Sequence, residues 1–171
     1  KNRLWLGCKE GLGVLNLTSL DAMFLKNGTH GINDMPEASC RRVYSDSKGK
    51  IWLGFEGSGL SIMSIDTIDN QPVFSFKNFI SDDNKNTISK NTILSILEGE
   101  DGVFWIGTYG GGLNKFDTKT GIFKYYTEED GLSNNAIYGI LNDAEGNLWI
   151  STNFGISVFD TKKEQFKIFT E

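Results

Sequence analysis

The sequence is poor in the residues from which metal and catalytic centres are most often built. It has 2 cysteines, 2 prolines and a single histidine, His30, among 171 residues. A zinc site takes several Cys, His or carboxylate ligands, so Cys8, Cys40 and His30 do not form one by themselves and no metal site is predicted. We expect both cysteines to be buried free thiols, although a disulfide between them stays open because a sequence does not show how close their Cα atoms are.

Charge and hydropathy exclude two further classes of partner. The 17 basic and 22 acidic residues give a net charge of −5 without any basic run, so binding to the phosphates of a nucleic acid has no electrostatic support. No apolar stretch approaches the roughly 20 residues that span a bilayer. The chain opens at Lys1 and enters a predicted strand almost at once. We therefore expect a part of a longer protein, with any membrane or targeting segment outside this chain.

What the sequence does contain is a repeat built around its tryptophans. All 4 stand in the same setting: an apolar residue, Trp, an aliphatic residue and a small residue. The four copies are Leu4–Gly7, Ile51–Gly54, Phe104–Gly107 and Leu148–Ser151. The tryptophans are 47, 53 and 44 residues apart (52 − 5, 105 − 52 and 149 − 105). A period of roughly 40 to 50 residues built on short strands is typical of propeller blades.

Each repeat is predicted to hold four antiparallel strands, which we name A to D in chain order. In the last repeat, alternating apolar residues place them at 136–141, 148–152, 156–160 and 166–170. The first repeat has only strands B, C and D, so we expect three full blades and one blade without its inner strand. The predicted blades cover 1–30, 31–80, 81–127 and 128–171. Because a propeller of this period usually has more blades, the prediction is an all-β protein forming an open arc of a larger β-propeller.

The residues that recur in every repeat have structural explanations. A Trp on strand B is large and flat enough to fill the seam between successive blades, which accounts for Trp5, Trp52, Trp105 and Trp149. Two residues later a side chain would crowd the neighbouring sheet, which accounts for Gly7, Gly54 and Gly107. An acidic residue at the end of strand C accepts hydrogen bonds from the following turn, the role predicted for Asp66, Asp117 and Asp160.

The turns that differ between repeats are the candidates for function. The B–C turns and D–A loops of a propeller emerge on one face, and varied loops on a fixed scaffold suit recognition. A sugar would need an aromatic face, for which Tyr109 and Phe154 are available. It would also need planar polar groups, for which the candidates are Glu56, Asn91, Asn135 and Asn153. The alternative is that these are ordinary loop residues, and Asn91 and Asn135 also suit turns.

The two later repeats resemble the two-component regulator propeller repeat. The likeness lies in 105–113 (Trp-Ile-Gly-Thr-Tyr-Gly-Gly-Gly-Leu), 130–135 (Asp-Gly-Leu-Ser-Asn-Asn) and 146–150 (Gly-Asn-Leu-Trp-Ile), while the Gly-His and Trp-Asp marks of WD40 repeats are absent. In that family such repeats form the periplasmic sensor region of hybrid histidine kinases of Bacteroidetes. The resemblance implies a periplasmic sensor segment of a two-component histidine kinase that responds to oligosaccharides and reaches the membrane only through segments outside this chain.

Catalysis and a cofactor are not predicted for this segment. General acid–base chemistry needs a positioned carboxylate pair or a tuned histidine, and most carboxylates here fall in equivalent turns of the repeat. The run Asp82–Asn86 is not a calcium loop, because Thr87 and Ile93 stand where glycine and glutamate are required. Two alternatives stay open: a protein-interaction scaffold and, less favoured, a propeller lyase or glycosidase fragment. We also expect the rest of the propeller, or a second copy, to cover the exposed blade faces.

Overall fold

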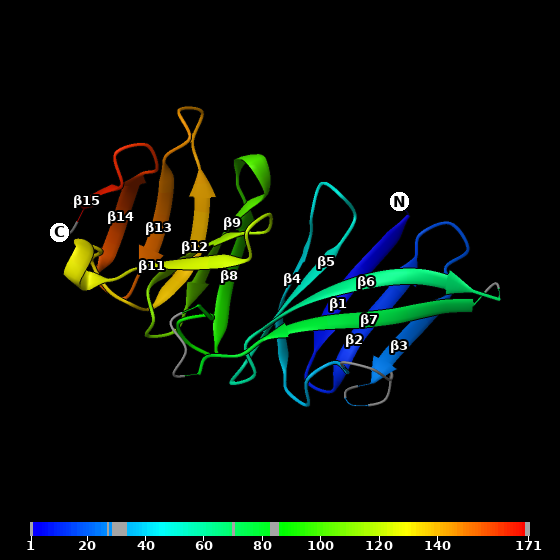
Figure 1. The fold of residues 1–171 in the computed structure, drawn as a ribbon. Coiled ribbons are helices and arrows are strands. Elements are labelled where there is room, and N and C mark those ends of the chain that lie inside the picture. Colours follow the sequence, from blue (N-terminus) through cyan, green and yellow to red (C-terminus); the bar gives the residue numbers. More distant parts are fainter. Residues whose placement is uncertain (1, 27, 29–33, 70, 83–85, 170–171) are drawn as a thin grey trace.

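The structure, a computed structural model, describes residues 2–26, 28, 34–69, 71–82 and 86–169. Within these residues it has fifteen strands in four antiparallel sheets, and two short 3-10 turns. The sheets follow one another along the chain and stand in a row, with the first and the last at opposite ends (Figure 1). The predicted fold class, all-β with four antiparallel sheets that do not close on themselves, is confirmed.

Each sheet is a simple meander, so the order of its strands in space is their order in the sequence. The first sheet has three strands, β1 (Arg3–Cys8), β2 (Gly11–Asn16) and β3 (Ala22–Lys26). The second has β4 (Cys40–Ser45), β5 (Ile51–Phe55), β6 (Leu60–Ile68) and β7 (Gln71–Phe79). The third has β8 (Ile93–Glu98), β9 (Val103–Thr108), β10 (Leu113–Asp117) and β11 (Ile122–Tyr126). The fourth has β12 (Ile137–Asn142), β13 (Leu148–Thr152), β14 (Gly155–Asp160) and β15 (Gln165–Phe169).

The two 3-10 turns lie outside the sheets, at η1 (Glu100–Gly102) and η2 (Glu128–Asp130). No helix in the described part of the chain has the length and apolar character that crossing a membrane requires.

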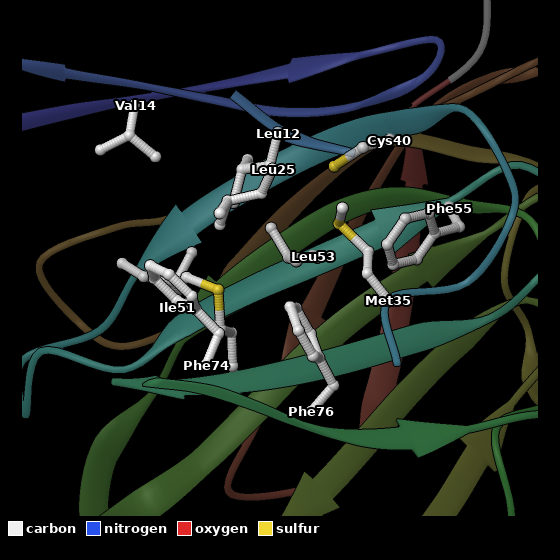
Figure 2. Close-up of a cluster of buried hydrophobic side chains, with 11 residues drawn as sticks. Leu12, Val14, Leu25, Met35, Cys40, Ile51, Leu53, Phe55, Phe74 and Phe76 are labelled. Carbon is white, nitrogen blue, oxygen red and sulfur yellow. The ribbon is translucent and has the colours of Figure 1, made fainter. Parts of the chain in front are cut away.

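The hydrophobic core is divided into three layers, one in each seam between successive sheets. Figure 2 shows seam 1–2, where Leu12 and Leu25 of the first sheet face Leu53 and Phe76 of the second. Seam 2–3 is built on Trp52, which stacks on Phe104 with ring centroids 3.7 Å apart and an interplanar angle of 18°. Every sheet therefore has two apolar faces, one for the preceding blade and one for the following blade.

The tryptophans of strand B lie in equivalent positions but in different surroundings. Trp52 and Trp105 are buried in seams 2–3 and 3–4, and Trp5 packs at the margin of seam 1–2. Trp149 occupies the same place on β13, the described residues form no sheet against it, and 43% of its surface is exposed. Burial of this residue therefore depends on the neighbouring blade and not on the local sequence.

The glycines two residues after these tryptophans allow the sheets to approach one another. A Cβ atom on Gly107 would lie 2.5 Å from Ile137 Cγ2, and one on Gly7 would lie 2.5 Å from the carbonyl oxygen of Cys40. For Gly54 the nearest atom, in Ile93, would be 2.8 Å away. Real Cβ contacts are longer than this, so any side chain at these positions would push successive sheets apart.

Two expectations about individual residues are corrected. Asp117 and Asp160 do accept hydrogen bonds from the turns that follow strand C, for example from the Lys119 amide at 2.7 Å and the Lys163 amide at 3.0 Å. Those backbone hydrogen bonds hold the pKa of both carboxyl groups below the usual range. Asp66, by contrast, does not end its strand, because β6 continues to Ile68 and pairs with β7 along its whole length.

The cysteines form the second correction. Both are free, and Cys40 is buried in seam 1–2 as expected. Cys8 is exposed instead of buried, because β1 is an edge strand and its sheet is the first in the row. Burial raises the pKa of the Cys40 thiol to about 12.

Candidate functional site

Each full sheet has a β-bulge near the start of its inner strand. The pairing with the next strand skips one residue between Cys40 and Arg42 in β4, between Ile93 and Ser95 in β8, and between Ile137 and Gly139 in β12. The skipped residues are Arg41, Leu94 and Tyr138. A bulge bends its strand and re-aims a side chain, and bulges are frequent next to functional sites. The same device therefore presents three chemically different side chains at equivalent points of three blades.

Each bulge residue has a counterpart fifteen residues later, in the B–C turn of its own blade: Glu56, Tyr109 and Asn153. The Arg41 guanidinium donates from Nε and Nη2 to Glu56 Oε2 at 2.9 and 2.7 Å. The Tyr138 hydroxyl donates to Asn153 Oδ1 at 2.9 Å. Two of the three equivalent pairs thus hold a polar residue of the B–C turn against the inner strand.

The third pair, Leu94 and Tyr109, is apolar at the bulge and aromatic in the turn. Leu94 is largely buried, whereas 57% of Tyr109 is exposed. The backbone of Tyr109 is nevertheless anchored, because its amide donates to the Thr92 carbonyl at 2.9 Å and the residue forms a β-bridge with Ala136 of the next blade. An exposed aromatic ring on an anchored backbone offers a contact surface at little cost in conformational entropy.

Phe154 provides a second exposed ring at this end of the molecule. It follows Asn153 in the B–C turn of the fourth sheet and is 65% exposed. Its amide donates to Thr152 Oγ1 at 3.1 Å. Together with Tyr109 it is one of two large exposed aromatic residues in the B–C turns of the described chain.

Arg42 connects the bulges of two adjacent blades. Its Nε donates to the Leu94 carbonyl of the third sheet, and its Nη1 donates to the Arg41 carbonyl at 3.1 Å. The two bulge residues Arg41 and Leu94 are therefore linked through one guanidinium. The geometry of the site therefore depends on how the inner strands β4 and β8 lie relative to each other.

Asn91 and Asn135 lie at the same end but use their polar groups within the chain. Asn91 Oδ1 accepts from the Ser81 amide at 2.6 Å, and its carbonyl accepts from the Gly59 amide at 2.7 Å. Asn135 Oδ1 accepts from the Glu128 amide at 2.9 Å, and its carbonyl accepts from the amides of Gly110 and Gly112 at 3.0 and 2.9 Å. Both residues tie a D–A loop to the B–C turn of the preceding blade.

The structure brings Glu56, Tyr109, Asn153 and Phe154 to the B–C turns of three successive blades, as the sequence indicated. Sequence reasoning missed Arg41 and Tyr138, which touch two of them. The constant spacing of fifteen residues was the signal that could have found them, but a bulge becomes visible only when the strands are paired. His30 lies outside the described residues, and within the described residues no three His, Cys, Asp or Glu side chains gather to hold a metal ion.

A row of antiparallel meanders, with Trp5, Trp52 and Trp105 at equivalent places in the three seams between them, defines this chain as a segment of a β-propeller. Residues 87–110 and 131–154 match the family described as Two component regulator propeller. Two segments of the chain therefore match the two-component regulator propeller repeat, in agreement with the resemblance predicted from the sequence.

The relatives of this chain include one curated protein and extracellular domains of known structure. Histidine kinase P4 from Formosa agariphila is 27% identical over 170 residues, which is 98% of this chain and 12% of that protein. The extracellular domain of BT4673 from B. thetaiotaomicron, assigned as a one component system, has a TM-score of 0.76 at 23% identity, covering 98% of this chain and 23% of that chain. The extracellular domain of BT3049 from the same organism, assigned as a hybrid two component system, has a TM-score of 0.75 at 22% identity, covering 99% and 22%.

These relatives are much longer than the chain. It spans 12% of the kinase and less than a quarter of each extracellular domain. At 22 to 23% identity the two structures show a shared fold, and a shared fold does not carry a function with it. In its fold, this segment therefore resembles the extracellular domains of sensor proteins.

Proposed function

We propose that this chain is a ligand-recognition segment in the extracytoplasmic, periplasmic part of a two-component sensor histidine kinase, without catalysis of its own. The matching repeats, the relationship to Histidine kinase P4 and the likeness to two extracellular domains support the class of protein. The observation that supports recognition is local: one scaffold holds three equivalent pairs of different chemistry, Arg41–Glu56, Leu94–Tyr109 and Tyr138–Asn153.

The ligand class proposed for this end of the molecule is an oligosaccharide. Sugar rings present a C–H face that packs on aromatic rings, and Tyr109 and Phe154 expose such rings. Sugar hydroxyls are satisfied by planar polar groups: the guanidinium of Arg41 can donate to them, and the amide of Asn153 can donate and accept. A ligand that touches two or more blades would favour one packing of the propeller against the next module, and this population shift would carry the signal.

The experiment is calorimetric titration of the chain with maltotetraose, cellotetraose and tetragalacturonate, followed by the same titrations on variants. We expect at least one of these sugars to bind, and Tyr109→Ala and Phe154→Ala each to weaken its affinity about tenfold, the loss of one aromatic contact of about 1–1.5 kcal/mol. Phe24, on β3, is an aromatic residue that is also half-exposed, so Phe24→Ala is the matched control and should leave binding unchanged. Binding that survives both loop variants would contradict this site.

The sensor class is tested by the reading frame that contains this segment. A membrane-spanning helix followed by a histidine-kinase core is the expected result. Membrane vesicles from cells expressing the full protein should then show autophosphorylation that changes when the sugar reaches the extracytoplasmic side. A soluble reading frame made of blades alone would contradict the proposal and favour an interaction scaffold.

We also propose that a further blade covers each end face of the row. On the last sheet, Trp149, Ile156 and Phe169 stand at the positions where the third sheet has Trp105, Leu113 and Tyr126, and they are exposed whereas those are buried. On the first sheet Leu4, Leu6 and Phe24 are exposed. The isolated chain should therefore self-associate in sedimentation, and a stable monomer over a wide concentration range would contradict this.

A further inference from the structure

A cavity of about 500 Å³ lies in seam 3–4, at the end of the sheets opposite the B–C turns. Its wall comes from the turn between β8 and β9, from Trp105 on β9, and from Leu148 on β13. Charged and polar groups at its rim include Glu98, Lys115 and Asn142. A cavity of about 390 Å³ also lies in seam 2–3, but Trp52 does not line it, whereas Trp105 lines the cavity of seam 3–4.

The first reason for the cavity is a missing ring. In seam 2–3, Phe104 precedes the Trp of its own strand and stacks on Trp52 of the blade before. In seam 3–4 the equivalent residue is Leu148, which faces Trp105 with a smaller side chain. In seam 1–2 it is Ile51, and there too a cavity, of about 410 Å³, lies beside Trp5. In both seams without the stacked ring, the Trp of strand B lines the cavity, whereas stacked Trp52 does not line the cavity of its own seam.

The second reason is a missing carboxylate. Trp52 Nε1 donates to Asp46 Oδ2 at 2.9 Å, and Trp149 Nε1 donates to Asp143 Oδ2 at 3.1 Å, with the aspartate six residues before the Trp in both blades. The residue six positions before Trp105 is Gly99. A Cβ on Gly99 would lie 2.9 Å from Trp105 Nε1. Gly99 therefore supplies no carboxylate to accept the indole N–H of Trp105, as an aspartate does for Trp52 and Trp149.

The indole N–H of Trp105 is consequently left as a free donor. Trp105 is 4% exposed, and its Nε1 donates no hydrogen bond to any described residue. Asp34 Oδ1 is the one fully buried side-chain polar atom without a partner in the described part of the chain, so Trp105 Nε1 keeps contact with solvent. Since Trp105 and Gly99 both line the cavity, that contact is at the cavity wall.

The rim carries charges of both signs, and some already have partners. The Glu98 carboxylate accepts from the amide and the hydroxyl of Ser47 at 2.8 and 2.6 Å. The Lys115 ammonium lies 5.5 Å from the Trp105 ring centroid and 3.8 Å from Glu164 Oε1. Glu100, Asp101 and Lys162 complete the rim. The three carboxylates would repel an anion, and the two ammonium groups would repel a cation. A neutral molecule with several hydroxyls would instead find both hydrogen-bond donors and acceptors.

We propose that this cavity binds a neutral polyhydroxylated molecule of one or two sugar units, with one hydroxyl oxygen accepting from Trp105 Nε1. Its volume lies within the roughly 300–1,000 Å³ of small-molecule sites, and Leu97, Val103 and Leu148 supply an apolar wall for the C–H face of the ring. The site goes beyond the proposed function, because it lies at the opposite end of the blades and uses none of the residues of the B–C turns.

The test follows the indole resonances of the 15N-labelled chain during titration with glucose, galactose and cellobiose up to about 50 mM. We expect the Trp105 indole signal to shift with at least one of them while the Trp52 signal stays, since Trp52 is bonded to Asp46. Leu148→Phe, which supplies the missing ring, should weaken this response at least about tenfold. Ile51→Phe makes the same change in seam 1–2 and is the matched control, expected to respond as the wild type does.

Two further variants keep the result interpretable. Gly99→Ala puts a methyl group 2.9 Å from the indole nitrogen and should weaken the response as well, which covers the case in which Leu148→Phe does not fold. Tyr109→Ala removes a residue of the B–C turns and should leave the response intact, so the two sites can fail independently. A Trp105 signal that none of the three sugars moves, or that still moves in both folded cavity variants, would overturn the assignment.

Discussion

The close approach of successive sheets leads to a sharp prediction about one glycine. In Gly107→Ala the new methyl group would lie 2.5 Å from Ile137 Cγ2 and 3.0 Å from Ile137 Cβ. Ordinary contacts of this kind begin at 3.4 Å, so the nearest one is short by 0.9 Å (3.4 − 2.5). Ile137 is fully buried on β12 and belongs to the core of seam 3–4, so it has little room to move away.

The magnitude results from two opposing effects. Overpacking a filled core costs about 1–3 kcal/mol, whereas replacing a strand glycine by alanine regains about 0.5–1 kcal/mol by restricting the unfolded chain. The two ranges leave a net loss of roughly 0–2.5 kcal/mol, centred near 1 kcal/mol, in the free energy of unfolding. The matched control is Gly13→Ala on β2, where the new Cβ would have its nearest neighbours at 3.6 Å, and we expect this variant to be neutral or slightly stabilised.

Urea unfolding followed by circular dichroism measures both variants against the wild type under one set of conditions. The expected order of stability is Gly13→Ala at or above the wild type and Gly107→Ala clearly below it. If Gly107→Ala unfolds at the same urea concentration as Gly13→Ala, the sheets are not in the contact described and the packing argument fails.

Three further predictions concern the hydrogen bonds and the titrating groups. Asp46→Ala should lower the free energy of unfolding by about 1–3 kcal/mol, because it leaves the buried Trp52 indole and the amides of Lys48 and Lys50 without their acceptor. Asp143→Ala should cost less, because the indole that Asp143 accepts from belongs to exposed Trp149. Urea unfolding of the two variants compares these losses. Hydrogen bonds from the Lys124 ammonium and then the Tyr126 hydroxyl hold the pKa of Glu164 below its ordinary 4.5. The ionised carboxylate therefore stabilises the fold above pH 4.5, and this stabilisation is lost as the pH falls through the lower, folded-state pKa. Glu164→Gln should flatten the acid side of a plot of urea midpoint against pH, and an unchanged slope would contradict this. Ellman's reagent at pH 8 should titrate one thiol in the native protein, exposed Cys8, and a second only in urea, because burial raises the pKa of Cys40 to about 12; two thiols reacting at once in the native state would refute this.

Most of the fold could be predicted because its signals are local. Strand B of the last repeat was expected at 148–152 and β13 covers the same residues. Alternating apolar residues and the turn glycines report on the chain's immediate neighbourhood, and four copies of the pattern reinforce one another. The long β6–β7 hairpin was underestimated, because Asp66 looked like the residue that ends strand C elsewhere and only the pairing with Val73 shows that it does not.

The candidate site was less accessible to sequence reasoning. The turn residues Tyr109 and Phe154 could be selected because they vary on a repeating frame, and both are exposed. Arg41 and Tyr138 could not, because a bulge is a property of two paired strands. The hydrogen bonds that occupy Asn91 and Asn135 join a loop to the preceding blade's turn, and no pattern in either segment alone reveals them.

Local sequence was enough to establish the number of blades in this chain, the order of their strands and the strand that carries each tryptophan, because all three depend on residues close together along the chain. The surroundings of each tryptophan, by contrast, were settled by the packing of the sheets. Trp52 is stacked and bonded, Trp105 keeps a free N–H beside a cavity, and Trp149 is exposed. Those differences come from the neighbouring sheet: Phe104 packs on Trp52, Leu148 faces Trp105, and no described sheet packs on Trp149. Such contacts exist only once the sheets have packed.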